Sequence, residues 1–465
     1  MKKIVILLSI ASLLILPVIT SAQITWKKNY GLPDRDENVY SMIITTDSNY
    51  LIAGTVMNNN FADCLFLMLD KYGDTIWAKS YGGAKADVAY CVQQTFDGGF
   101  IAGGVRDYFM DSGSGNLFGD MWIMKLDILG DTVWTKTYSG TFYSFANSIV
   151  QNIDSTYTVA GVSDNSSPNV GGDIWILKLD TCGNIINSKT YGSQIYPGFD
   201  RAESIRKTFD GNTVVVGTSS TYKIWVLKLD ANCDTIWSKS IEGTYAADIL
   251  QTSDSGYVVI GRTTIDGDIY KLNQIGDTDW TKKFELPNGF FSPTSIEQTA
   301  DNGFVVCGTQ ADRIGFVKLD ATGDTLWSKM YNCMQANWND FSTSALETFD
   351  GGYIFAGTIK SAVSGYDNDI SLVKTDENGI VSISKNNNIN SKSIEIYPSP
   401  ATINITIGVP QKAEIDIYNI EGQIIKTMMS SDNGIIINIE NFSSGVYVVK
   451  AKTDKEILQG KFIKQ

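Results

Sequence analysis

Residue types that support catalysis are unevenly represented in this chain, which has 51 acidic residues and no histidine. The lack of histidine excludes Ser-His-Asp and Cys-His catalysis, and any zinc or copper site with histidine ligands. Glycoside hydrolysis needs only two carboxylates across a cleft. Candidate carboxylates in the irregular segments, among which the sequence shows no pairing, are Asp107, Asp111, Asp120, Asp164, Asp200, Glu203, Asp340 and Asp367.

Two short acidic motifs have the spacing of partial calcium loops. Asp266 and Asp268 flank a glycine, and Asp367 and Asp369 flank an asparagine. Neither motif is followed by a full set of oxygen ligands, so we interpret both as turns. We therefore expect no metal site and no cofactor.

Aromatic residues that no repeat requires are interleaved with Asn, Asp, Ser and Gly in the same irregular segments. This mixture suits glycans, whose rings stack on aromatics while their hydroxyls bond amides and carboxylates, and it suits protein partners equally. The alternative is that these aromatics only fix their own loops. The candidate ligand-binding residues are Tyr108, Phe118, Tyr143, Tyr196, Phe199, Trp338 and Tyr366.

The irregular segments lie between the copies of a sequence repeat, or between strands within one copy. A Leu-Asp pair, or Leu-Asn or Thr-Asp in one copy each, followed by a tight turn ends each copy, at Asp70, Asp127, Asp180, Asp230, Asn273, Asp320 and Asp376. Copies with four short strands at a period of roughly 40 to 50 residues are typical of propeller blades. In the second copy, alternation predicts strands over 76–81, 89–95, 99–103 and 121–127. The fold predicted is all-β, a seven-bladed β-propeller followed by a small Ig-like β-sandwich.

The connections between these strands divide between the two faces of the ring. Four antiparallel strands in a blade place alternate turns on opposite faces, so the short Asp-Gly-Gly and Gly-Asp-Thr turns share one face. The variable connections share the other face, and variable loops on a repetitive scaffold are where binding usually occurs. We expect the ligand site there, within 105–119, 162–172, 191–201, 284–293, 331–341 and 358–368.

Residues that recur in nearly every copy are better explained by packing than by binding. Trp, Lys and Tyr alternate on one strand, as at Trp134, Lys136 and Tyr138, which puts all three on one strand face. We expect the tryptophans to pack between blades and the lysines to pair with repeated aspartates. A column of small residues, mostly serine, includes Cys91 and is expected to satisfy backbone groups between blades. All six cysteines are expected to be free or locally paired thiols, not a disulfide framework.

The two chain ends carry segments of a different kind. Lys2 and Lys3, an apolar run over 4–19 and small residues before Ala22 predict a signal peptide at 1–22, cleaved between Ala22 and Gln23. The mature chain is then expected not to span a membrane. The net charge is −14 and becomes more negative when the two lysines are removed, so we expect no nucleic-acid partner.

Residues 394–465 show no trace of the repeat and resemble the sorting domain of the type IX secretion system of Bacteroidota. The resemblance rests on three motifs, which include Tyr397, Pro398 and Pro400, then Gly422, and finally Gly445 and Tyr447. Ser399 stands where the family usually has asparagine. The resemblance implies recognition and cleavage by the type IX secretion machinery after export through the periplasm. The product is then secreted or anchored at the outer-membrane surface.

The repeats resemble those of uncharacterised surface propellers, and more weakly the tryptophan-docking repeats of quinoprotein dehydrogenases. No quinone- or calcium-binding residues of the latter can be matched, so their activity is not implied. We expect a propeller at 23–384, a linker at 385–393, and a surface or secreted protein that binds a glycan or a protein. A hydrolase or lyase that uses loop carboxylates, and a structural adhesion component, are the alternatives. Either 26–30 or 380–384 is expected to close the ring.

Overall fold

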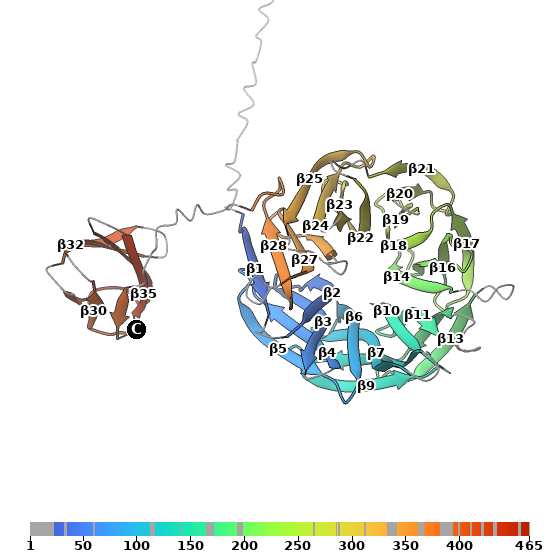
Figure 1. Ribbon diagram of the computed structural model, residues 1–465, viewed down its shortest axis with the longest axis horizontal. Helices are drawn as coiled ribbons and strands as arrows, with labels where there is room; N and C mark the ends of the chain where they lie inside the picture. Colours follow the sequence, from blue (N-terminus) through green and yellow to red (C-terminus); the bar gives the residue numbers. More distant parts are fainter. Residues whose placement is uncertain are drawn as a thin grey trace, which may run out of the picture. The chain divides into compact units, whose positions relative to one another are not determined.

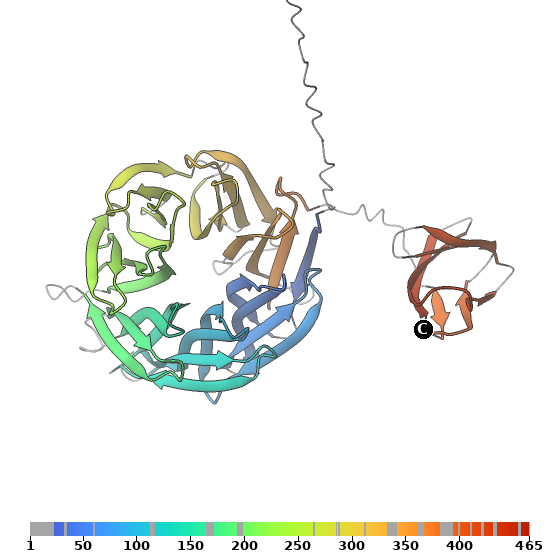
Figure 2. The same cartoon turned by 180° about the vertical axis from the view of Figure 1, so that it is seen from behind.

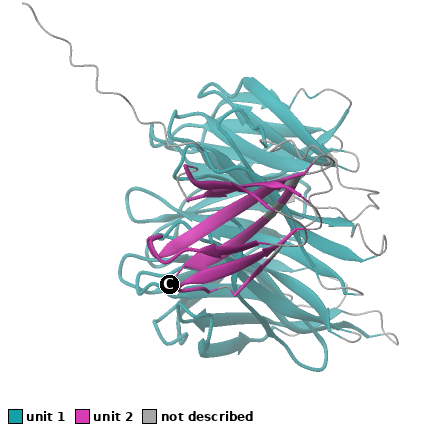
Figure 3. Ribbon diagram, turned by 90° about the vertical axis from the view of Figure 1, so that its left-hand side faces the viewer, with its two compact units in different colours: residues 1–382 teal, residues 383–465 magenta. Residues whose placement is uncertain are grey.

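The computed structural model describes residues 23–31, 35–58, 61–111, 117–140, 142–163, 172–192, 199–263, 266–284, 286, 289–310, 313–332, 342–360, 367–381, 394–398, 400–409, 412–419, 423–430, 435–453 and 457–464. The predicted signal peptide therefore lies outside the described residues. The chain divides into two compact units, residues 1–382 and 383–465 (Figure 3). In the described part of the chain, no helix is long and apolar enough to cross a membrane.

The first unit is a ring of seven four-stranded antiparallel sheets (Figures 1 and 2), as predicted. Each sheet is one blade, and its strands are named from the innermost to the outermost. Blade 1 contains β2 (Glu37–Ile44), β3 (Tyr50–Asn58), β4 (Phe61–Leu69) and β5 (Thr75–Tyr81). Blade 2 contains β6 (Ala86–Gln94), β7 (Phe100–Met110), β8 (Leu117–Leu126) and β9 (Thr132–Tyr138). Blade 3 contains β10 (Ser144–Gln151), β11 (Tyr157–Ser163), β12 (Asp173–Leu179) and β13 (Ile185–Tyr191).

The remaining blades have the same strand order. Blade 4 contains β14 (Arg201–Lys207), β15 (Thr213–Thr218), β16 (Ile224–Leu229) and β17 (Thr235–Ile241). Blade 5 contains β18 (Tyr245–Gln251), β19 (Tyr257–Arg262), β20 (Gly267–Leu272) and β21 (Thr278–Lys283). Blade 6 contains β22 (Phe291–Gln298), β23 (Phe304–Gln310), β24 (Arg313–Leu319) and β25 (Thr325–Asn332). Blade 7 contains β26 (Ser342–Glu347), β27 (Tyr353–Lys360), β28 (Asn368–Thr375) and, outermost, β1 (Trp26–Tyr30).

The ring closes through the N-terminal strand. Strand β1 pairs antiparallel with β28, with Trp26 opposite Lys374 and Tyr30 opposite Ile370. Of the two closing segments expected, residues 26–30 therefore take the outer position. In the same way, the Trp-containing strand that begins each sequence repeat is the outermost strand of the preceding blade. The predicted strand at 76–81 therefore belongs to blade 1 and not to blade 2.

The strands of blade 2 are longer than predicted. Strand β7 runs to Met110 and β8 begins at Leu117, so most of the expected loop at 105–119 is an extended hairpin. A register shift between Arg106 and Phe109 breaks this hairpin, at a point where Asp107 has a positive φ of 54°. The extension was missed because the alternation of apolar residues stops at the blade core, whereas backbone pairing continues beyond it.

The Trp-Lys-Tyr strands clamp neighbouring blades together, as expected. The ring of Trp134 lies against Gly183 in the turn of the next blade, and its Nε1 donates to the carbonyl of Thr181 at 3.0 Å. The hydroxyl of Tyr138 donates to the carbonyl of Gly183 at 2.6 Å. Repeated lysines pair with turn aspartates, for example Lys239 with Asp277 and Lys282 with Asp324 at 2.6 and 2.5 Å. Packing between blades therefore accounts for this column.

Blades 3 and 4 meet through a different pair of residues. Asn187 stands where the other outer strands have tryptophan, and Cys233 stands where the other turns have glycine. Cys233 is buried with a positive φ of 63°, and the Asn187 amide donates to the carbonyl of Asn232 at 2.5 Å. A smaller side chain on the strand is thus matched by a larger one on the turn. No disulfide joins the described cysteines Cys64, Cys91, Cys182, Cys233 and Cys307, as expected.

The second unit is a sandwich of two antiparallel sheets around its own core. One sheet contains β29 (Glu395–Tyr397), β30 (Asn404–Gly408) and β33 (Ile435–Asn438). The other contains, in order, β32 (Ile424–Met429), β31 (Glu414–Tyr418), β34 (Gly445–Lys452) and β35 (Ile457–Lys464). Alternate residues such as Ile405, Ile407, Ile415 and Ile417 are fully buried between the sheets, as the period of a half-buried strand requires.

Candidate functional site

A β-bulge in the innermost strand of every blade sets the surface around the ring axis. The register shifts between Val39 and Ser41 in blade 1, and the equivalent shift recurs in all seven blades. A bulge leaves one residue unpaired and re-aims its side chain. The bulge residues are Tyr40, Tyr90, Asn147, Glu203, Ala247, Thr294 and Thr343. They provide aromatic groups in blades 1 and 2 and polar or small groups in blades 3 to 6.

The two bulge tyrosines begin a continuous run of aromatic rings. Tyr40 contacts Tyr90 edge-on at 5.3 Å between ring centroids, and Tyr90 contacts Phe145 at 5.9 Å. Phe145 stacks on Tyr143 at 5.9 Å, and Tyr143 stacks on Phe199 at 5.8 Å. We call these five residues the aromatic run. It crosses blades 1 to 4, and Tyr40 and Phe199 at its ends are 38% and 41% exposed.

A second group of rings adjoins this run at the end of β7 and the start of β8, which we call the hairpin tip. Phe109 stacks on Phe118 at 5.1 Å, and Phe118 contacts Phe142 at 6.0 Å. The ammonium of Lys85 lies 3.9 Å from the Phe109 ring centroid, where the ring face attracts a cation. Gly119 forms a bridge to Tyr143, and its N–H donates to the carbonyl of Phe142 at 3.3 Å. The hairpin tip and the aromatic run are therefore joined through the backbone.

Buried carboxylates hold these elements in place. Asp87 is fully buried and accepts hydrogen bonds from the N–H groups of Gly83 and Asp107 at 2.8 and 2.9 Å. Burial raises the pKa of Asp87, and the two backbone bonds only partly oppose that effect. Asp200 is 1% exposed and accepts from the N–H of Ser220 at 2.7 Å. Both carboxylates thus tie a loop of the variable face to a neighbouring connection.

Two ion pairs lie in blades 4 and 5. Arg201 binds Glu203 on the same strand, with Nη2 and Oε1 2.6 Å apart. Burial raises the pKa of Glu203, although the Arg201 charge opposes the shift. Nearer the short-turn face, Arg206 binds Asp248 at 2.9 Å, and this carboxylate raises the pKa of the Arg206 guanidinium. The surface around the axis is therefore aromatic in the early blades and ionic in the later ones.

The small-residue column joins adjacent blades, as expected. Ser344 Oγ accepts from the N–H of Met42 at 3.1 Å across the blade 7 and blade 1 boundary. Asp248, which replaces serine in blade 5, accepts from Ser204 Oγ at 2.6 Å and from the N–H of Ile296 at 3.3 Å. This column is explained by bonding between blades.

The structure brings together four of the seven candidate ligand-binding aromatics. Tyr143 and Phe199 are in the aromatic run, Phe118 is in the adjoining group, and Tyr108 pairs with Ala86 on the inner strand of blade 2. Tyr196, Trp338 and Tyr366 lie outside the described residues. Sequence reasoning missed Tyr40 and Tyr90. Each directly precedes a member of the small-residue column, and that position was the available signal.

The candidate catalytic carboxylates are less concentrated. Asp200 is bonded to Ser220 and Glu203 to Arg201. Asp107 contributes its N–H to Asp87, and its carboxylate lies 3.9 Å from Arg106. Asp164 and Asp340 lie outside the described residues. Among His, Cys, Asp and Glu of the described residues, no group of three or more is placed to hold a metal ion.

In the second unit, residues of the sorting motifs converge at one end of the sandwich. Gly445 begins β34 opposite Lys464, the last residue of β35, and the N–H of Ala401 donates to the carbonyl of Ile463 at 2.8 Å. Tyr397, Pro398 and Pro400 are exposed just before Ala401. Tyr447 is buried instead, stacked on Phe462 at 5.3 Å. Gly422 lies outside the described residues, in the connection between β31 and β32.

Comparison with known families identifies this second unit. Residues 395–465 match the family described as the secretion system C-terminal sorting domain, which confirms the resemblance found in the sequence. The tail indicates export by the type IX secretion system to the cell surface or the medium, and it implies interaction with that machinery. No curated protein sequence matches the chain.

Solved structures resemble the ring in fold. A streptogramin B lyase has a TM-score of 0.50 and 13% identity, covering 76% of this chain and 98% of its own. Virginiamycin B lyase from Staphylococcus aureus has a TM-score of 0.47 and 12% identity, covering 75% and 99%. A protein of unknown function from Bacteroides caccae has a TM-score of 0.42 and 14% identity, covering 61% and 93%. At these identities the likeness to the streptogramin B lyase supports the propeller fold alone.

Proposed function

We propose that this exported propeller is a glycan-binding protein whose site is the aromatic run and the ionic groups beside it. The observation that carries the proposal is the contact of five rings across four blades, with centroids 5.3 to 5.9 Å apart. The exposed ends of the run, Tyr40 and Phe199, offer ring faces and edges to the apolar faces of sugars, while the buried Tyr143 packs between Phe145 and Phe199. The aromatic contacts between blades exist without a ligand, so the surface is already organised for binding.

Polar groups next to the run supply the complementary half of a sugar site. Glu203 is the bulge residue of blade 4, and Arg201 binds it from the same strand that follows Phe199. A carboxylate and a guanidinium can accept and donate hydrogen bonds to hydroxyl groups, while aromatic rings cover the opposite face. Arg201 is 42% exposed at its side chain, so part of this pair is accessible to a ligand.

The position of the site agrees with the arrangement of the blades. Phe199, Tyr143 and the β7–β8 tip belong to the connections of the variable face, whereas Tyr40 and Tyr90 lie further along the inner strands. Inserted or lengthened connections at one face alter what is bound without changing the repeated core. Display of this face by an exported protein fits a ligand outside the cell.

The proposal is tested by screening the chain from Gln23 to Gln465 on a glycan array and measuring affinities of the hits by calorimetry. Phe199→Ala and Tyr40→Ala are each expected to weaken a glycan hit at least about tenfold, as for loss of a central aromatic contact. Phe209→Ala is the matched control, because Phe209 is 71% exposed in a short turn of the opposite face. No glycan hit, or equal weakening by Phe209→Ala, would contradict the proposal.

A further inference from the structure

Within the described residues, six of the seven boundaries between blades have a polar contact that the boundary between blades 7 and 1 lacks. The last inner-strand residue reaches back to the turn of the preceding blade, as when Gln94 Oε1 accepts from the N–H of Thr46 at 2.9 Å. The same contact is made by Gln151, Gln251, Gln298 and Glu347, and Lys207 bonds Asn152 instead. We call this contact the seam clip. Ile44 occupies the position at the closing boundary and cannot form it.

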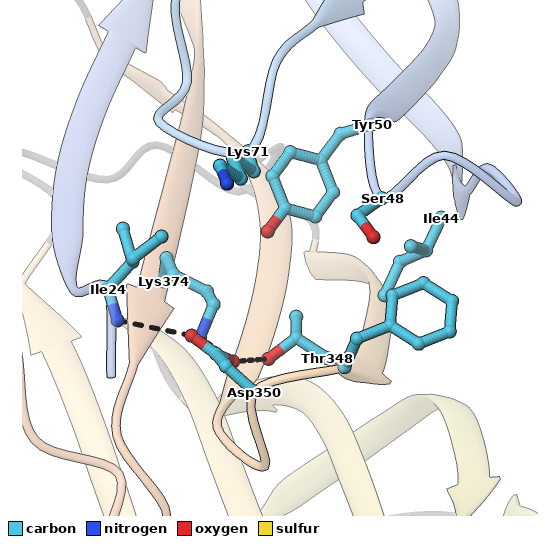
Figure 4. Close-up of a pocket in the computed structure, with 9 residues that line it drawn as sticks. Ile24, Ile44, Ser48, Tyr50, Lys71, Thr348, Asp350 and Lys374 are labelled. Atoms are coloured by element: carbon cyan, nitrogen blue, oxygen red, sulfur yellow. Dashed lines mark hydrogen bonds and ion pairs between the residues drawn. The ribbon is translucent and has the colours of Figure 1, made fainter. Parts of the chain in front are cut away.

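A pocket of about 310 Å³ is present where the clip is missing (Figure 4). Its lining comes from three separate parts of the chain, namely Ile24 before β1, Ile44 and Tyr50 of blade 1, and Phe349 of blade 7. Phe349 is 73% exposed at its rim. Apolar walls of this kind in a pocket of this size suit a small organic ligand.

The acidic group of the pocket is already engaged. Asp350 accepts from Lys374 Nζ at 2.8 Å, from Thr348 Oγ1 at 2.6 Å and from the N–H of Ile24 at 3.1 Å (Figure 4). Its charge is balanced by Lys374, whose side chain is 2% exposed. These groups therefore form a neutral, hydrogen-bonded wall rather than a site for a cation.

Two donors on the other side of the pocket have no acidic partner among the described residues, although the exposed Lys71 ammonium lies 5.2 Å from the Tyr72 ring centroid. Tyr50 is 3% exposed, and within the described ranges its hydroxyl makes no hydrogen bond, while Figure 4 shows it pointing toward the centre of the lining residues. Lys71 lines the same side and forms no ion pair with any residue that the structure describes. Its backbone is fixed, because its carbonyl accepts from Trp26 Nε1 at 3.2 Å.

We propose that the closing boundary of the ring is a second ligand site that binds a small organic carboxylate with an apolar body. The carboxylate takes the bonds of the Tyr50 hydroxyl and the Lys71 ammonium, and the apolar part lies against Ile24, Ile44 and Phe349. This site is on the short-turn face and is independent of the proposed glycan site. Because its lining joins blades 7 and 1, bound ligand stabilises the closed ring by mass action.

The experiment uses 3-phenylpropionate as the probe, with 3-phenylpropionamide and 3-phenylpropylamine as matched neutral and cationic compounds. Binding to the chain from Gln23 to Gln465 is followed by ligand-detected NMR and by the melting temperature. The carboxylate is expected to bind saturably below about 10 mM and at least about fivefold tighter than either analogue. A rise in melting temperature with the carboxylate alone is the expected second readout.

Ile44→Gln separates loss of the site from loss of the fold. It installs the seam clip found at Gln94 and replaces part of the apolar wall with a polar side chain, so it is expected to weaken binding while leaving the melting temperature equal or higher. Lys71→Gln is expected to weaken the affinity for 3-phenylpropionate at least about fivefold, whereas Lys223→Gln on the opposite face leaves this affinity unchanged. The proposal is overturned by no saturable binding, by preference for the amide or amine, or by undiminished binding in Ile44→Gln.

Discussion

Asn187 and Cys233 form a matched pair at the boundary of blades 3 and 4. We therefore predict that Asn187→Trp is unfavourable alone and Cys233→Gly is neutral alone, but that the two substitutions together stabilise the ring. At the six boundaries with tryptophan and glycine, a Cβ added to the glycine would lie 2.5 to 2.8 Å from a ring atom. Asn187→Trp should therefore collide with the Cys233 side chain and cost about 2 kcal/mol, within the range for overpacking. Cys233→Gly removes a strained left-handed residue, worth about 1 kcal/mol, and loses buried thiol contacts of similar value.

The double variant recreates the boundary found elsewhere in the ring, and we expect it to be about 1 kcal/mol more stable than the natural chain. The coupling energy between the two substitutions is then about 3 kcal/mol. At about 2.1 cal/mol/K of unfolding entropy per residue, a ring of this length shifts by roughly 1.3 °C per kcal/mol. Asn187→Trp should lower the melting temperature by about 3 °C, and adding Cys233→Gly should raise it slightly above the starting value.

The assay is a double-mutant cycle measured by calorimetry and by urea unfolding. The reverse cycle is the control: Trp77→Asn and Gly130→Cys at the boundary of blades 1 and 2 should show the same sign of coupling, since Gly130 lies against Trp77. Effects that add within about 0.5 kcal/mol in both cycles would refute the reasoning. Additivity would mean that turn and strand residues at these boundaries are chosen independently.

Two further predictions concern the whole ring. Burial opposes ionisation of Asp254 and Asp301, but hydrogen bonds from threonine and buried lysine side chains outweigh it and lower each pKa to about 2. Each folded pKa lies below the unfolded value of about 3.9, so each carboxylate stabilises the folded ring fully above that pH. This contribution to the free energy of unfolding, about 1 kcal/mol for each half-exposed carboxylate, is lost as the pH approaches 2. Melting temperatures from pH 5 to 2 should fall less steeply in Asp301→Asn; an identical slope would contradict the assignment. Deleting residues 23–30, and with them β1, should lower the melting temperature sharply because β28 loses its outer partner and becomes an edge strand, and an unchanged value would show that another segment closes the ring.

The repeated part of the fold could be predicted because every blade faces the same packing problem. Trp134, Lys136 and Tyr138 recur since each outer strand must contact the same turn of the next blade. The bulges were not predictable in this way, because an unpaired residue such as Tyr40 interrupts the period of two without changing composition. The length of β7 escaped prediction for a related reason, since the pairing of Phe109 with Phe118 lies beyond the apolar core.

The candidate sites show a corresponding limit. Phe199 and Tyr143 could be singled out because they break the repeat, and the structure adds the rings that connect them. The closing pocket had no such signal, since Ile44 looks like an ordinary strand residue until it is compared with Gln94 across the boundary. Tyr50 likewise occupies a regular core position, and only the surroundings of its hydroxyl distinguish it.

The pairing of β1 with β28 also determines when during export the ring can be completed. Trp26 lies opposite Lys374, so nearly the whole propeller must emerge before its first strand finds its place. Contacts between residues so distant in sequence form late and slowly. Until then, the first and last blades remain the ends of an open arc with unpaired backbone, a form that other strands can join. The time for which a chain of this kind depends on protection by other proteins is therefore set by how late its last blade becomes available to pair with its first strand.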